Sequence, residues 1–366
     1  MNINIDRDIL LKPLSNVSGI VEKRHALPIL SNLLIEGKSN KLKFTATDLE
    51  MQISLEIDSE LTDEFSTTIA ARKLFDITRA LPDQSKMNLQ IEENKALVKA
   101  GKSKFNLQTL PSKDYPLMKK TDGDNLSFEL SQNQLKGVLK QVDFAMAQQD
   151  IRYYLNGLLF ELEGNKLNIV GTDGHRLSFT STEQKGQKEN FQTIVPRKTI
   201  LELIKLLEDN DEKVVVIFAK NQIIFTFNNI ELISKVIDGK FPDYHRVIPQ
   251  NHENKFTINR AQLLSSMQRA SILSNEKYRG IRIVIESNNL KLISSNSDQE
   301  QAEEELEIAY TGPSIDIGFN VNYIIDVLTN IQFDTLEFAF HDSSSSCLIT
   351  IPNNQNYKYV VMPMRI

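Results

Sequence analysis

Residues 166–177 read Lys166-Leu-Asn-Ile-Val-Gly-Thr172-Asp-Gly-His-Arg176-Leu177, and their pattern recurs once on either side in the chain. Upstream, Lys41-Leu-Lys-Phe-Thr-Ala-Thr47-Asp48 shows the same strand-like alternation and the same Thr-Asp ending. Downstream, Asn289-Leu-Lys-Leu-Ile-Ser-Ser-Asn296 repeats the strand pattern but ends in asparagine. The second residue of each stretch is a matching leucine, and these leucines are 125 and 123 residues apart. Regular self-similarity of this kind predicts tandem copies of one structural unit.

Other landmarks keep the same period. Short strands that run into an N-cap residue are expected at 3–6, 128–131 and 256–259, and a helical pattern follows each of them. A second helical pattern opens at Arg72, Arg197 and Val321. Each repeat is expected to be an α+β domain in which two helices pack on about eight strands of antiparallel sheet. We place the three repeats at 1–123, 124–251 and 252–366.

The first repeat gives the most detailed expectation. Leu10, Leu14 and Val17 follow helical spacing after Asp6, the expected N-cap. Pro13 lies inside this pattern and predicts a kink or an irregular turn, because proline removes a helical hydrogen bond. A second helix is expected at 72–81, and strands are expected at 30–36, 41–46, 51–57, 87–92, 95–100 and 103–109.

The composition excludes several classes of protein. Forty per cent hydrophobic and 25% charged residues are typical of a folded chain rather than a disordered or fibrous one. Cys347 is the only cysteine, which excludes an internal disulfide or a cysteine zinc site. The N-terminus lacks a signal-peptide pattern, and the apolar run Val214–Ala219 is far shorter than the ~20 residues of a membrane helix. We therefore expect a cytoplasmic protein without membrane contact.

Positive charge is concentrated on the helices although the net charge is −6. A chain this acidic does not coat nucleic acid by overall attraction, so any DNA contact must come from local basic faces. The expected helices carry such faces, for example Lys136 with Lys140 and Arg197 with Lys198. Four of six expected helices share this feature, which favours one common surface that faces phosphate. Exposed lysines that serve only solubility are the alternative.

The two ends of the chain differ in charge. Near the end of the first repeat, Lys102 and Lys104 alternate with Phe105 and Leu107. The third repeat carries the acidic run 300–307, which includes Glu300, Glu303 and Glu304, and the apolar pair Ile272 and Leu273 lies upstream. Complementary ends favour head-to-tail association of several copies of the chain. Such an assembly closes into a ring if the rotation that relates neighbouring copies brings the last copy back to the first. A solvated acidic strand is the alternative interpretation of 300–307.

Catalytic motifs are not apparent in the sequence. Ala100-Gly-Lys-Ser103 resembles the end of a phosphate-binding loop, but Ala96 stands where its first glycine is needed. Asp173 beside His175 is the best candidate for an enzyme, either a hydrolase or a nucleotide-processing enzyme. A turn-forming aspartate explains the recurring Thr-Asp better. A third possibility is a protein-interaction scaffold without DNA, against which the basic helix faces argue.

The chain resembles the bacterial DNA polymerase III beta subunit family, the replicative sliding clamps. The resemblance extends over the whole sequence. Specific motifs that carry it include Leu11-Lys-Pro-Leu14, Thr172-Asp-Gly-His-Arg-Leu177, Phe241-Pro-Asp-Tyr244 and Tyr359-Val-Val-Met-Pro-Met-Arg365. It implies a head-to-tail homodimer whose six domains form a closed ring around double-stranded DNA. It also implies no catalytic residue, no metal and no cofactor.

The resemblance also implies the binding residues. Positions at or near DNA are Arg24, Arg72, Lys73, Gln149, Tyr153, Tyr154, Arg197 and Lys198. The dimer contact would join Phe105 and Leu107 to Ile272 and Leu273, with Lys102 and Lys104 facing Glu300, Glu303 and Glu304.

A cleft for short peptides is implied between the second and third repeats. Its occupants would be segments of the replicative DNA polymerase, the clamp loader, translesion polymerases and mismatch-repair proteins. The matching positions are Arg152, Leu155, Thr172, Gly174, His175, Arg176, Leu177, Pro242, Arg246, Val247, Asn320, Tyr323, Ser346, Val360, Met362, Pro363, Met364 and Arg365. Ser344 and the terminal Ile366 depart from the family pattern, and we expect them to adjust peptide preference.

Overall fold

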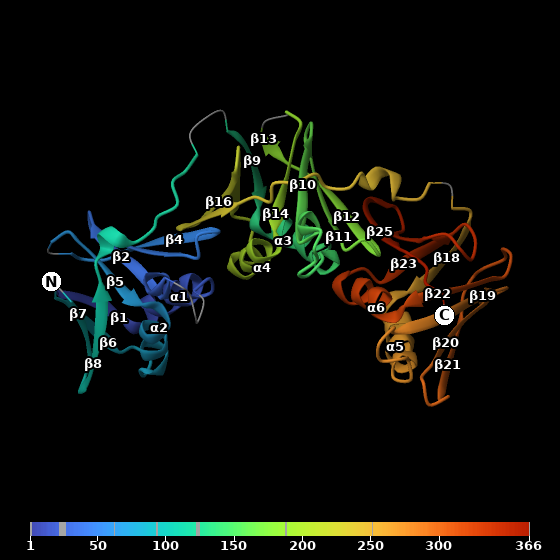
Figure 1. Ribbon diagram of the computed structural model, residues 1–366, viewed down its shortest axis with the longest axis horizontal. Helices are drawn as coiled ribbons and strands as arrows, with labels where there is room; N and C mark the ends of the chain where they lie inside the picture. Colours follow the sequence, from blue (N-terminus) through green and yellow to red (C-terminus); the bar gives the residue numbers. More distant parts are fainter. Residues whose placement is uncertain are drawn as a thin grey trace. The chain divides into compact units, whose positions relative to one another are not determined.

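The computed structural model describes residues 2–21, 27–61, 63–92, 94–121, 125–186, 189–250 and 252–365 (Figure 1). The chain forms two compact units. The first comprises 1–133, 185–187 and 201–236, and the second comprises 134–184, 188–200 and 237–366. In the described part of the chain, no helix combines the length and apolar character that crossing a membrane requires.

The order of elements repeats three times, which confirms the predicted tandem α+β fold. The first copy contains β1 (Asn2–Asp6), α1 (Arg7–Ser18), β2 (Asn32–Lys38), β3 (Lys41–Thr47), β4 (Met51–Asp58), β5 (Phe65–Ala70), α2 (Ala71–Ala80), β6 (Lys86–Ile91), β7 (Lys95–Ala100) and β8 (Ser103–Leu110).

The second copy follows this order and adds one short strand, β13. It contains β9 (Leu126–Ser131), α3 (Gln132–Lys140), β10 (Gly157–Glu163), β11 (Lys166–Thr172), β12 (Arg176–Glu183), β13 (Lys185–Gly186), β14 (Phe191–Pro196), α4 (Arg197–Leu206), β15 (Lys213–Ala219), β16 (Gln222–Phe227) and β17 (Ile230–Lys235).

The third copy returns to the order of the first. It contains β18 (Asn254–Asn259), α5 (Arg260–Ser271), β19 (Gly280–Glu286), β20 (Asn289–Ser295), β21 (Gln301–Glu307), β22 (Ile315–Asn320), α6 (Val321–Asn330), β23 (Thr335–Phe340), β24 (Cys347–Ile351) and β25 (Asn354–Val361). In this copy α5 and α6 pack together over a core that includes Leu263, Ile324 and Phe338.

Neighbouring copies share sheets. β4 of the first copy pairs antiparallel with β17 of the second, with Met51 opposite Ser234. β12 of the second copy pairs in the same way with β25 of the third, with Leu177 opposite Val360. The first join produces a 13-stranded sheet and the second an eight-stranded sheet. The strand that follows the recurring Thr-Asp turn therefore pairs with the last strand of the next copy.

Helix starts agree with the predictions in part. Asn259 caps α5 by accepting a hydrogen bond from the Gln262 amide at 3.0 Å. Asp6 occupies the N-cap position of α1, but its side chain makes no capping hydrogen bond, so the predicted cap is wrong in this detail. Pro13 lies within α1, which continues to Ser18 with Pro13 buried. Sequence reasoning also missed β5, between β4 and α2.

Candidate functional site

The Thr-Asp sequence forms the same turn in the first two copies. The carboxylate of Asp173 accepts hydrogen bonds from the His175 and Arg176 amides at 2.9 and 3.0 Å. Asp48 accepts the equivalent bonds from Glu50 and Met51 at 2.9 and 2.8 Å. These bonds confirm the interpretation of Asp173 as a turn-forming residue.

The remaining oxygen of Asp173 is also occupied. It accepts a hydrogen bond from Arg176 Nε at 3.1 Å. The His175 ring is exposed and stacks against Tyr323, with ring centroids 6.5 Å apart. This carboxylate holds backbone and guanidinium rather than an imidazole, which leaves the enzyme interpretation without its general base.

A cavity opens beside this turn in the second unit. Its floor is an apolar cluster on the face of β10–β12 and β25, which includes Leu159, Val170, Leu177 and Val360. It is lined by Arg152, Tyr154, Leu155, Thr172, Gly174, Arg176, Leu177, Pro242, Val247, Val360 and Met362. The volume is about 120 Å³. A cavity of about 150 Å³ holds a benzene molecule, so this one has room for a single apolar side chain.

Two arginines form the polar side of the cavity. Arg152 donates from Nε and Nη2 to the Asp150 carboxylate at 3.0 and 2.9 Å, and from Nη2 to the Asp173 carbonyl at 3.0 Å. The Arg152 side chain, followed by its own backbone N–H, lowers the pKa of Asp150 to about 2. Arg176 is largely buried and donates to the Phe144 carbonyl at 2.7 Å. Both guanidiniums are therefore fixed before any ligand arrives.

The segment 241–248 covers one side of the cavity. Pro242 and Val247 from this segment face the cavity, while Tyr244 is buried in the apolar cluster. The Tyr244 hydroxyl donates a hydrogen bond to Glu161 on β10. Burial, together with this bond, raises the pKa of Tyr244, so the phenol keeps the proton that it donates.

The end of the chain completes the cavity. β25 ends at Val361, and the Met362 amide then donates to the His175 carbonyl at 2.9 Å. The Met364 amide donates to the Gly318 carbonyl at 2.8 Å. These bonds hold Met362 over the apolar floor, as expected for an apolar chain end that is docked.

Ten of the eighteen residues expected in the cleft line this cavity, and the others lie outside its lining. The side chain of Asn320 caps α6, and the Ser346 carbonyl is hydrogen bonded to His252. Arg246 is exposed and pairs with Asp243. Met364 and Arg365 line a separate depression with Tyr278 and Arg282. The remaining three are His175 and Tyr323, which stack on each other, and Pro363, between Met362 and Met364.

Sequence reasoning missed two residues of this site. Tyr154 was grouped with DNA-facing residues, whereas its side chain lines the cavity. Asp326 accepts a hydrogen bond from Arg176 at 2.5 Å across 150 residues of sequence.

Ser344, which departs from the family pattern, lies in a turn where its amide donates to Asp342 at 2.8 Å. Ile366 lies outside the described residues.

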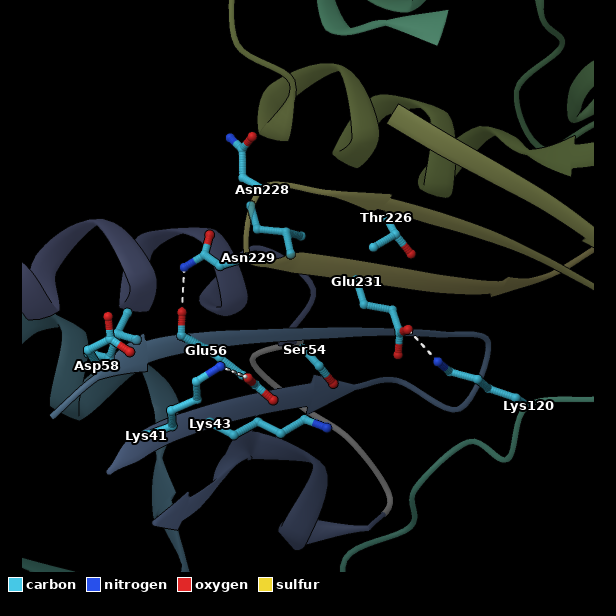
Figure 2. A pocket seen from close by; sticks show the side chains of 12 residues that line it. Lys41, Lys43, Ser54, Glu56, Asp58, Lys120, Thr226, Asn228, Asn229 and Glu231 are labelled. Carbon is cyan, nitrogen blue, oxygen red and sulfur yellow. Dashed lines mark hydrogen bonds and ion pairs between the residues drawn. The ribbon is translucent and has the colours of Figure 1, made fainter. Parts of the chain in front are cut away.

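The first junction between copies differs in chemistry from the second. There Gln52 occupies the position of Leu177, and it accepts a hydrogen bond from the Met118 amide at 2.8 Å, so the connecting segment is fastened over the sheet. A groove over β3, β4 and β17 is lined mostly by charged and polar side chains, as Figure 2 shows. Lys41 pairs with Glu56 at 3.4 Å, and Lys120 pairs with Glu231 at 2.5 Å. The apolar cavity is thus not repeated in this groove.

The residues expected to face DNA lie mostly on helix starts and one loop. Lys73 and Lys198 are exposed at the starts of α2 and α4. Arg72 donates to the Val21 carbonyl at 3.0 Å, and Arg197 donates to the Asp143 carbonyl at 3.3 Å. Gln149 and Tyr153 are exposed in the loop before β10. Arg24 lies outside the described residues.

The residues expected at the dimer contact lie on two strands and after α5. Lys104, Phe105 and Leu107 are on β8, and Lys102 is in the turn before it. Ile272, directly after α5, is 75% exposed. Glu303 on β21 pairs with Lys291 at 2.8 Å, and Glu304 pairs with Arg269 at 2.5 Å. Two of the three expected acidic partners therefore already have cations within their own chain.

Comparison with known proteins agrees with this architecture. Models of the N-terminal, central and C-terminal domains of the DNA polymerase III beta subunit match residues 1–119, 129–243 and 245–365. The chain is 43% identical to the beta sliding clamp of Pseudomonas aeruginosa and 41% identical to that of Escherichia coli, in each case over 100% of both chains.

Solved structures give the same result. The crystal structure of the DNA polymerase III subunit beta from Pseudomonas aeruginosa matches with a TM-score of 0.96 at 43% identity, over 100% of each chain. A structure of the sliding clamp from Bartonella birtlesii bound to griselimycin matches with a TM-score of 0.96 at 36% identity, again over 100% of each chain.

Proposed function

This chain belongs to the DNA polymerase III beta subunit family, and we propose that two copies join head to tail into a ring that encloses double-stranded DNA. Members of this family are sliding clamps, processivity factors that move along DNA, and this chain is one of them. In the proposed ring the protein carries no catalytic activity of its own. It works in the cytoplasm, where bacterial replication occurs.

The pattern of strand pairing is the observation that carries the ring. Inside the chain, the strand after the Thr-Asp turn pairs with the last strand of the next copy, as β4–β17 and β12–β25. In the third copy, the strand after the equivalent turn at Asn296 is β21, and no further copy follows it within the chain. By the same pattern, β21 would pair with the last strand of the first copy, β8, in another chain. β21 is the outermost strand of its sheet, and β8 pairs with β5 only through Thr109 and Leu110. Pairing of β21 with β8 of a second protein chain would give hydrogen-bond partners to the backbone groups on both strand edges.

Apolar contact would supply most of the dimer energy. Glu303 and Glu304 are already paired with Lys291 and Arg269, so they gain little from Lys102 or Lys104. Exposed ion pairs contribute only about 0–1 kcal/mol each. Burial of the exposed Ile272 and of the half-buried Leu273 and Phe105 therefore offers the larger stabilisation, at about 25 cal/mol for each Å² of apolar surface. Leu107 adds little, because it is only 7% exposed in the single chain.

DNA would be retained by enclosure and not by affinity. Lys73, Lys198 and the other cationic helix residues would make weak phosphate contacts that carry no sequence information. Such contacts exchange easily between neighbouring phosphates, so the ring would slide. Tight contacts would oppose movement.

The cavity beside Thr172 would anchor partner peptides. Its size suits one leucine or phenylalanine side chain, and the fixed guanidiniums of Arg152 and Arg176 provide a polar side with donors in place. The proposed partners are the replicative polymerase, the clamp loader, translesion polymerases and mismatch-repair proteins. We also expect griselimycin to bind and to compete with such peptides.

The ring is tested by retention on nicked circular DNA after loading with the cognate clamp loader and ATP, in moderately high salt. We expect the protein to stay on the circle and to be lost when the circle is cut, because linear DNA has free ends. Equal retention on circular and linear DNA would show ordinary electrostatic binding and would refute the ring.

A further inference from the structure

A group of metal-ligating side chains lies next to the cavity. Glu161 and Glu163 on β10 point to one face, because side chains two apart on a strand share a face. His245 follows Tyr244 in the segment 241–248 that covers the cavity. One potential ligand atom from each of these three side chains lies within 4.8 Å of the others.

The two carboxylates are held in place by neighbouring donors. Asn168, directly across from Glu161 on β11, is buried, and its amide nitrogen donates to Glu161 at 3.2 Å and to Glu163 at 2.9 Å. Tyr244 donates its hydroxyl proton to Glu161. Donors of this kind orient the first-sphere ligands of metal sites and raise metal affinity. These donors therefore hold the two carboxylates beside each other and within 4.8 Å of a His245 nitrogen.

The two carboxylates of this group have no ion-pair partner among the described residues. Lys166 lies opposite Glu163 on the neighbouring strand β11, but it forms no such pair with Glu163. Elsewhere on the chain, adjacent carboxylates share a cation, as Glu303 and Glu305 share Lys291. Two neighbouring carboxylates repel each other unless a cation lies between them. An imidazole ligand beside two carboxylates favours a borderline ion such as Zn²⁺ over Mg²⁺ or Ca²⁺, which prefer oxygen alone.

We propose that Glu161, Glu163 and His245 form a Zn²⁺ site that fixes the wall of the peptide cavity to β10. Three protein ligands leave a fourth position for water. His245 adjoins the residues that face the cavity, because Pro242 and Val247 come from the same segment. Bound zinc would join this segment to the strand that carries Glu161 and Glu163. A wall ordered in advance loses less freedom when a peptide binds, which increases peptide affinity.

The site is tested first by titrating the full-length protein with Zn²⁺ alone in a calorimeter. We expect one saturable site per chain, with His245→Ala and Glu163→Gln each weakening zinc affinity by about tenfold or more. Both side chains are exposed, so both variants should fold. His341→Ala is the matched control, since His341 is an exposed histidine stacked on His252 elsewhere in the unit. Zinc binding that survives both site variants, or that is lost in the control, would overturn the site.

The proposed effect of zinc on the cavity wall rests on the proposed peptide binding, and it is tested by a separate measurement. A fluorescent peptide with a glutamine and a leucine-phenylalanine end should bind about fivefold tighter with Zn²⁺ in the wild type, and His245→Ala should remove this gain. Unchanged peptide affinity despite bound zinc would refute the effect of zinc on the cavity wall and would leave the proposed peptide binding intact. Zinc binding without any peptide binding would instead contradict the proposed cavity function.

Discussion

The Arg176 guanidinium on β12 donates to the Asp326 carboxylate on α6 at 2.5 Å, which joins the second copy of the repeat to the third. The same guanidinium bonds Asp173 and the Phe144 carbonyl, and its carbon lies 4.6 Å from the centre of the Tyr323 ring. One side chain thus holds the turn, the helix and the wall of the cavity together. Its partners come from three separate parts of the chain: the turn at Asp173, the short helical turn at Phe144, and α6, which carries both Tyr323 and Asp326.

Replacing Arg176 by alanine should destabilise the protein strongly. The Arg176 side chain is 10% exposed, and its removal leaves Asp173 and Asp326 without their cation. Loss of one partner from a fully buried ion pair costs about 3–5 kcal/mol, and the cost here should be smaller because Asp173 is 18% and Asp326 39% exposed. Urea unfolding should show a loss of about 2–3 kcal/mol in Arg176→Ala. Arg246→Ala is the control, because Arg246 is 87% exposed and its pair with Asp243 is worth at most about 1 kcal/mol. Equal losses in the two variants would contradict this account.

Gly174→Ala should weaken peptide binding through Arg152. Gly174 has φ +88°, and a Cβ atom there would lie 2.7 Å from Arg152 Nη1. The guanidinium must move away from its place at the cavity, and the backbone is strained by about 1–2 kcal/mol. Gly164→Ala has the same backbone strain, with φ +61° and open space around the added carbon.

Both glycine variants should unfold at lower urea concentrations than the wild type. Only Gly174→Ala should lower the affinity for a labelled partner peptide, measured by fluorescence anisotropy. A similar loss of affinity in Gly164→Ala would show that the effect comes from general destabilisation and not from Arg152.

Much of this architecture is readable from the sequence because it is local or repeated. The Thr-Asp turn is fixed by an aspartate that bonds amides two and three residues later, and its recurrence predicts the copies. The pairs that cross the chain are different. Arg176 and Asp326 are 150 residues apart, and neither sequence pattern indicates the other. The polarity of the first junction likewise depends on the hydrogen bond from the Met118 amide to the Gln52 side chain. This bond joins residues 66 apart in sequence and becomes visible only in the folded structure.

The site residues show the same limit. The apolar chain end predicts docking from its own residues, whereas the peptide cleft beside Thr172 is implied by the family resemblance. Tyr154 is expected near DNA because the family resemblance implies it, and its own sequence context does not indicate the cavity. Glu303 and Glu304 look available for a partner chain until Lys291 and Arg269 are placed beside them.

The Asp150 and Arg152 pair should give a specific pH dependence. The pKa of Asp150 is lowered to about 2 by Arg152, whereas an unfolded aspartate titrates near about 3.9. Because the folded value is the lower one, the contribution to stability is complete above about pH 4 and is lost as the pH falls through about 2. A carbon-13 titration of the aspartate carboxyls should show a group that stays ionised at pH 3 in the wild type. The same signal should titrate at a higher pH in Arg152→Ala, although the retained backbone N–H of residue 152 still holds its pKa below the ordinary value, and an unchanged midpoint would contradict the assignment.

Dimer formation should depend on the apolar residues after α5. Ile272→Ala combined with Leu273→Ala removes one exposed and one half-buried apolar side chain, so light scattering should report the monomer mass. Ile151→Ala is the control, because Ile151 is 97% exposed but lies in the loop before β10, and this variant should remain dimeric. A double variant that keeps the dimer mass would show that the contact lies elsewhere.

Removal of 362–366 should abolish peptide binding and preserve the dimer. Met362 lines the cavity, and the amides of Met362 and Met364 hold this end of the chain to His175 and Gly318. β25 ends at Val361, so the truncated chain keeps its last strand and the core beneath it. Anisotropy with a labelled polymerase-tail peptide should show no saturable binding, while light scattering still gives the dimer mass. Arg365→Ala is the control, since Arg365 is exposed outside the cavity lining. Undiminished affinity after truncation would place the peptide site elsewhere.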